Sequence, residues 1–143
     1  MTIAGEAREV ALAEAQAVLA SGGERFAPLV AAIDAGEIEL DDEPLLESLL
    51  ELGLQTGRIR AYYGPGGEQA AHATLRKLPR GRERSESTRD VSAALSALHG
   101  RTLDSVKIAA VAPGAFTLSL EADGVEASIR LDGNGARLTS IGT

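Results

Sequence analysis

The chain of 143 residues contains no cysteine, no tryptophan and only two histidines. The absence of cysteine excludes disulfide bonds and any zinc or iron–sulfur site built on thiolates. No group of carboxylates and histidines has the spacing of a metal motif, so we expect neither a metal nor a cofactor. A chain without cysteine suits a reducing compartment, and we expect a cytoplasmic protein.

Aromatic residues make up 3% of the chain, so its core has to be built from leucine, valine, isoleucine and alanine. No apolar run approaches the roughly 18 residues of a membrane span. Glu6, Arg8 and Glu9 interrupt any secretory signal. The formal net charge of −7 argues against nucleic-acid binding, which requires lysine and arginine to displace phosphate counterions. We therefore expect a single domain over residues 1–143 without membrane or nucleic-acid contacts.

Helical periodicity dominates residues 4–99. Apolar residues recur there at spacings of three and four, and glycine or proline interrupts the pattern. The segments expected to be helical are about 4–20, 24–35, 43–52, 56–63, 68–78 and 89–99. Residues 80–88 contain no large apolar side chain, which predicts an exposed, mobile loop. Ser87 and Asp90 form a capping box for the last helix.

Alternating apolar residues over 103–141 predict a strand meander with one buried face. Turn sequences separate the apolar runs, and Asp123-Gly124 and Asp132-Gly133 are strong hairpin signals. The expected fold class is α+β, with a helical N-terminal region packed on a C-terminal four-stranded antiparallel β-meander. In element order, residues 89–143 are similar in outline to cystatin-like and nuclear-transport-factor-like folds. That similarity implies no function.

The segment from Tyr62 to Gly67 is the candidate ligand site. Two tyrosines precede a glycine-rich loop, and Gly66 and Gly67 open the next expected helix, whose N–H groups can hold an anion. His72 lies on that helix and can act in acid–base chemistry if Glu68 orients it. An ordinary connection between helices explains the same residues, and no catalytic motif accompanies them.

Charge is distributed in blocks. Twelve of the 21 acidic residues lie in residues 1–54, whereas residues 55–90 carry eight of the 14 basic ones. The candidate partner-binding residues are Glu39, Asp41, Asp42, Glu47 and Glu51 on the acidic side and Arg80, Arg82 and Arg84 on the basic side. Solvated surfaces explain these blocks equally well.

Separated charge and missing catalytic motifs favour a non-enzymatic protein–protein interaction or regulatory accessory domain. Its partner is another protein or a second copy of the chain, because opposite charges on one chain permit self-association. The alternative is a small-ligand-binding domain or a minor enzyme, whose pocket lies between sheet and helices.

Overall fold

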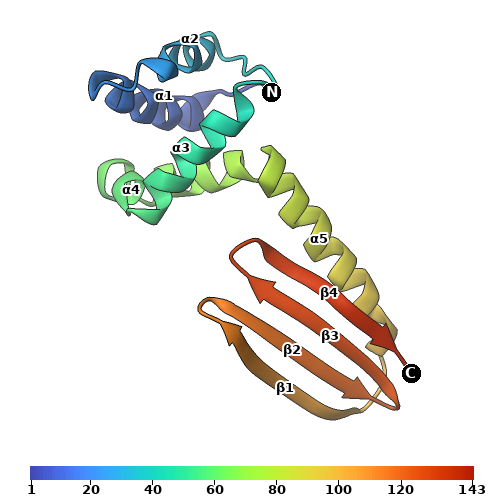
Figure 1. The fold of residues 1–143 in the computed structure, drawn as a ribbon. Helices are drawn as coiled ribbons and strands as arrows, with labels where there is room; N and C mark the ends of the chain where they lie inside the picture. The colour runs from blue at the N-terminus through green and yellow to red at the C-terminus, as the bar shows by residue number, and fades with distance from the viewer. The chain divides into compact units, whose positions relative to one another are not determined.

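The computed structural model describes residues 1–143 and confirms the α+β fold class (Figure 1). Helices occupy the N-terminal part of the chain, and a four-stranded antiparallel sheet follows. The chain divides into two compact units, unit 1 (Met1–Arg82) and unit 2 (Glu83–Thr143). The main elements are α1 (Gly5–Ala20), α2 (Ala27–Ala35), α3 (Glu43–Gln55), α4 (Arg58–Leu75), α5 (Pro79–Leu95), β1 (Leu103–Ala112), β2 (Ala115–Ala122), β3 (Val125–Asp132) and β4 (Gly135–Gly142). Short 3-10 helices cover Glu24–Phe26 and Ser96–Leu98.

Unit 1 is a helical bundle with an aliphatic core. Helix α1 packs against α2, α3 and α4, and α3 also packs against α4. Phe26 is the one aromatic residue in a core otherwise made of leucine, isoleucine, valine and alanine, as the composition requires. None of the helices combines the length and apolar character needed to cross a bilayer.

Helix α4 joins two segments that the sequence separates. Gly64 has non-helical backbone angles, φ 69° and ψ −171°, and Pro65 follows it. This conformation suits glycine, and the resulting kink is the predicted break between helices. Beyond the kink, Gly67 is buried, and a Cβ there would lie 2.3 Å from Tyr63 Cβ of the same helix, whereas Val10 Cγ2 of α1 would lie at an ordinary contact distance of 3.4 Å. The glycine therefore permits the kinked backbone of α4, which brings this position against Tyr63.

The loop expected at residues 80–88 is a helix, so this prediction is wrong. Helix α5 begins at Pro79, whose fixed φ suits the first turn of a helix and whose missing N–H costs nothing there. The scarcity of apolar side chains in this segment reflects exposure, because a helix with a narrow buried stripe has few of them. In the unit 2 portion of α5, Ser87 is half-buried and Val91 is buried. Their spacing of four places both on one side of the helix.

Unit 2 contains the predicted meander, with strand order β1-β2-β3-β4. Residues directly opposite one another share a face of an antiparallel sheet. One row across all four strands consists of Ile108, Leu118, Ile129 and Leu138, and a second consists of Val106, Leu120, Ala127 and Ile141. The neighbouring row of Lys107 and Ser119 points the other way. The sheet thus has an apolar face and a polar face.

Asp132 organises the turn between β3 and β4. One oxygen of its carboxylate accepts a hydrogen bond from the backbone N–H of Asn134 at 2.9 Å. The other oxygen accepts from Arg137 Nη2 at 2.8 Å and from Arg130 Nε at 3.3 Å. The Asn134 N–H and the two guanidinium groups lower the pKa of Asp132, so the ionised carboxylate stabilises the hairpin.

We expect Asp132→Asn to destabilise the protein at neutral pH, because the folded state loses a charge that two arginines contact. A carboxyl group whose pKa is lowered by folding stabilises the protein above its unfolded pKa. That contribution is lost as the pH falls through the lower pKa of the folded state. Urea unfolding of both proteins should therefore show a stability difference that shrinks as the pH falls below 3.8. A difference that stays constant across this range would contradict the assigned ionisation.

Candidate functional site

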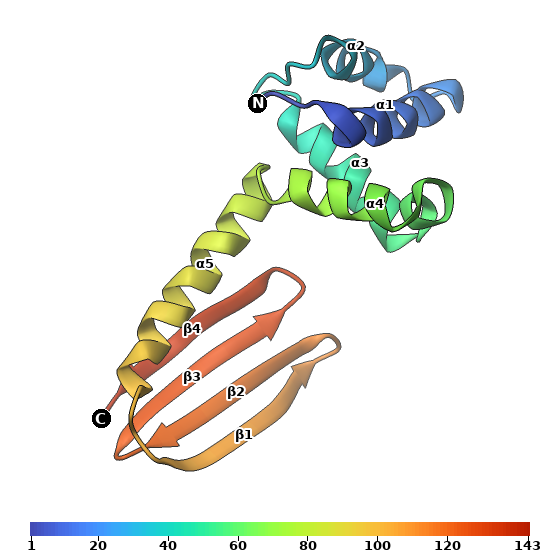
Figure 2. The ribbon, with the colours of Figure 1, turned by 180° about the vertical axis from the view of Figure 1, so that it is seen from behind.

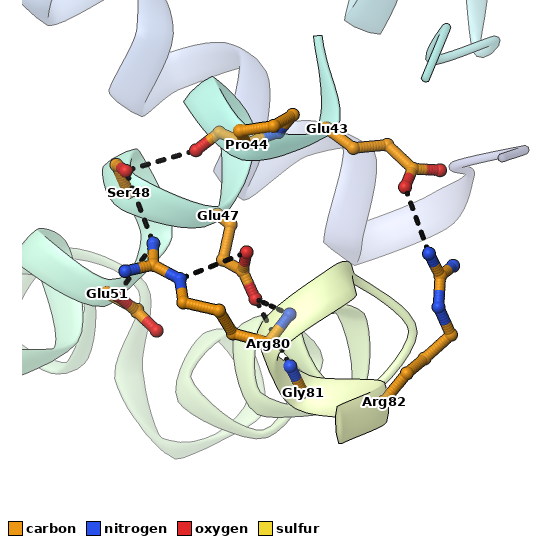
Figure 3. A network of polar contacts seen from close by, with 8 residues as sticks. All are labelled: Glu43, Pro44, Glu47, Ser48, Glu51, Arg80, Gly81 and Arg82. Carbon is orange, nitrogen blue, oxygen red and sulfur yellow. Dashed lines mark hydrogen bonds and ion pairs between the residues drawn. The ribbon is translucent and has the colours of Figure 1, made fainter. Parts of the chain in front are cut away.

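The acidic and basic blocks of the sequence meet inside unit 1 (Figure 3). Glu47 on α3 is 2% exposed and is surrounded by the start of α5. Its Oε1 accepts hydrogen bonds from the backbone N–H groups of Arg80 at 2.9 Å and Gly81 at 3.2 Å. The first N–H groups of a helix have no partner within the helix, and the helix dipole favours a negative charge there. Glu47 therefore caps α5 from another helix.

Arginine side chains complete this network. Arg80 Nε lies 3.2 Å from Glu47 Oε2, and Arg80 Nη2 lies 3.1 Å from Glu51 Oε2. Arg82 Nη2 lies 3.4 Å from Glu43 Oε2, and the Glu43 side chain is also buried. Four of the predicted partner-binding residues therefore form ion pairs within unit 1. They are Glu47, Glu51, Arg80 and Arg82.

The remaining candidate partner residues do not join this network. Glu39 and Asp41 are exposed, and Asp42 is half-buried just before α3. Arg84 belongs to unit 2, where its side chain lies beside Gly135 at the β3–β4 turn. The structure therefore does not gather the predicted charged residues into one surface.

We expect Glu47→Ala to lower the free energy of unfolding by about 1–3 kcal/mol, because two backbone N–H groups lose their acceptor. The matched control is Glu39→Ala, which removes an exposed carboxylate and should change stability by less than about 0.5 kcal/mol. Chemical denaturation measures both. Equal effects of the two substitutions would contradict the capping role of Glu47.

The predicted ligand residues lie on α4 but do not converge. Tyr62 and His72 are exposed, whereas Tyr63 is half-buried. Gly66 lies against the Glu6 carboxylate, so α1 already supplies an acidic group at this helix turn. An anion placed there would be repelled by that carboxylate.

Tyr63 takes part in a polar cluster between α1 and α4. Its hydroxyl donates to Glu14 Oε1 at 3.2 Å, and Arg58 Nε donates to the same oxygen at 3.0 Å. Burial, followed by the negative charge of Glu14, raises the pKa of Tyr63 above its usual value. The Glu14 side chain is itself buried, so the two donors compensate a carboxylate removed from water. The cluster ties α1 to α4.

In unit 2, the apolar face of the sheet is buried along β3 and open along β1. The helix runs along β4 in both views of the molecule (Figures 1 and 2). The Ser87 hydroxyl donates to the backbone carbonyl of Ala136, and Val91 is buried. Beside the helix, Ala127 and Ile129 of β3 are each 2% exposed. The β3 residues of this face are therefore packed, whereas on β4 Leu138 is half-buried and Ile141 is 39% exposed.

The other half of that face is open. Ile108 shares a row with Ile129, yet it is 65% exposed. Phe116 is also exposed, whereas Leu118 is half-buried. We call this surface the bare half-face; its residues are Leu103, Val106, Ile108, Ala110, Phe116 and Leu118.

The bare half-face corrects the expectation of one fully buried face. Alternation along a strand identifies which residues share a face, but it does not say what covers them. A four-stranded sheet is about 15–19 Å wide and a helix about 10 Å, so one helix covers about two strands. Unit 2 provides only α5 and a single 3-10 turn. The small number of helices next to the meander is the signal in the sequence that predicts the open half of the face.

Two hollows accompany the sheet. One lies on the polar face and is lined by Lys107, Glu121, Glu126 and serines of all four strands. The other is wide open and lies between the end of α5 and the start of β1, where Leu95, Leu98 and Leu103 line it. Neither is lined by Tyr62, Tyr63 or His72.

Comparison of the chain with protein-family models, with curated protein sequences and with solved structures found no match.

Proposed function

We propose that this protein is a non-enzymatic protein–protein interaction domain whose contact surface is the bare half-face. The observation that carries the proposal is the row of Ile108 and Ile129, two residues on one face of one sheet with opposite exposure. Contiguous exposed apolar groups are uncommon on monomers and mark interaction sites. An aromatic side chain, Phe116, lies among the aliphatic ones, as in the centres of many protein interfaces.

Most of the predicted partner-binding charges at the α3–α5 contact are already paired within unit 1, so they are less suited to bind a partner. Glu47, Arg80 and Arg82 already form ion pairs within unit 1, and a partner would have to break them. Breaking contacts to a buried carboxylate is costly. An apolar surface requires no such exchange, which favours the sheet over the charged blocks as the contact surface.

The alternative function, binding of a small ligand, is favoured by the polar hollow of the sheet. Ser105, Ser119, Ser128 and Ser140 offer hydroxyl groups, and Lys107 offers a cation, whereas two glutamates oppose an anion. A neutral polar ligand suits this lining. Because the hollow is half open, it would bury less of a ligand than pockets usually do.

The proposal is tested by replacing Ile108 with a photo-crosslinking amino acid in the full chain, in the cells of origin. The control position is Leu40, which is 76% exposed but lies in unit 1. We expect a discrete protein adduct at Ile108 that disappears when Phe116→Glu is introduced, because both residues belong to one surface. Equal adducts at the two positions, or an adduct insensitive to Phe116→Glu, would contradict the proposal.

A further inference from the structure

We propose that the occupant of the bare half-face is a second copy of this chain, which forms a two-fold symmetric dimer through β1 and β2. The inference rests on the proposed interaction function and names its partner. Sheets that pack face to face lie about 10 Å apart with nearly aligned strands, and their apolar side chains interdigitate. In a two-fold dimer, the same patch on each copy has to complement itself.

The exposed apolar side chains favour packing of two sheets face to face over pairing of their strand edges. β1 is an edge strand, so its outer N–H and C=O groups are open to another strand. Edge pairing would extend the sheet but would leave Val106, Ile108 and Phe116 in water. Packing face to face removes these side chains from water, and this is the larger gain.

Helix α5 restricts the orientation of the second copy. If β3 of one copy faced β3 of the other, the α5 helix of each copy would occupy the space of the other copy's sheet, because a helix about 10 Å across already lies along β4, where Ser87 is bonded to Ala136. A two-fold axis parallel to the strands avoids this overlap by placing β1 of each copy over β2 of the other. Each α5 then lies beside the β1 edge of the other sheet.

This arrangement places the one aromatic side chain of the surface over a small one. Ala110 and Phe116 are paired in the sheet, so the axis places Phe116 over Ala110 of the second copy. The same axis places Ile108 over Leu118 of the second copy, so two large aliphatic side chains meet there. Alternation of large and small groups across an interface allows close packing.

Charge does not oppose the contact. The bare half-face contains no ionisable side chain, and Lys107 and Glu121 lie on the opposite, polar face of the sheet. Two copies of a patch that carries charges of one sign would repel each other. No such penalty arises here.

The size of the surface predicts a weak dimer. Two strands at a spacing of about 4.8 Å and a rise of about 3.3 Å per residue cover roughly 300 Å² of flat area on each copy. Stable interfaces bury about 800 Å² per partner. The side-chain relief and the flank of α5 increase the contact, but it stays at the low end, so association should depend on concentration.

The test is sedimentation velocity of the full chain from about 10 μM to about 1 mM, a range suited to a weak dimer. We expect the weight-average sedimentation coefficient to rise toward that of a dimer. Ile108→Glu and Phe116→Glu should each weaken association at least tenfold, while circular dichroism shows an unchanged fold. The matched control is Ala109→Glu, which adds the same charge to the polar face of β1 and should leave the dimer intact.

Three results would overturn the dimer. These are a monomer over the whole range, an association that Ile108→Glu does not weaken, and an equal loss with Ala109→Glu, which would indicate edge pairing. The crosslinking experiment separates the two proposals. A monomeric chain with a specific adduct to another protein at Ile108 refutes the dimer and keeps the interaction function, whereas a monomeric chain without an adduct refutes both.

Discussion

A single helix is too narrow to cover a four-stranded sheet, and the surface of unit 2 follows from this constraint. α5 runs along β4, where Ser87 is bonded to Ala136, and Ile129 and Ala127 of the neighbouring β3 are buried. The same row of the sheet continues to Ile108, which remains in water. The free energy that burial of these side chains would contribute is what the proposed dimer contact draws on.

Helix α5 also links charge patterning to the fold. Its first N–H groups are held by Glu47, and its first arginines pair with the buried and half-buried carboxylates of α3. The two charge blocks of the sequence thus neutralise each other within unit 1. For this reason a blocky charge pattern is a poor indicator of a partner: the complementary block can lie on the same chain.

The sequence predicted the meander because strict alternation and Asp-Gly turns are local signals, and the pairing of Ile108 with Leu118 follows from them. It failed for α5, because Arg80 to Thr88 form a helix that is held by a tertiary contact with Glu47 and has few apolar residues of its own. The segment around Tyr62 and Gly67 is typical of a ligand site, but aromatic and glycine residues cluster in packing contacts as well as in binding loops. In unit 1, Gly67 instead permits the kink of α4, where a Cβ would clash with Tyr63. Exposure of the bare half-face depends on how many helices the unit provides, which no single strand reveals.

The most direct test measures how strongly a soluble paramagnetic agent relaxes the methyl groups of Ile108 and of Ile129 in nuclear magnetic resonance spectra. Dilute protein should show strong relaxation of the Ile108 methyls and little relaxation of the Ile129 methyls, because Ile108 is exposed and Ile129 is buried. As the protein concentration rises, the Ile108 methyls should become protected. Equal protection of both residues in dilute protein would contradict the account, since it would mean that the β1–β2 half of the face is already covered.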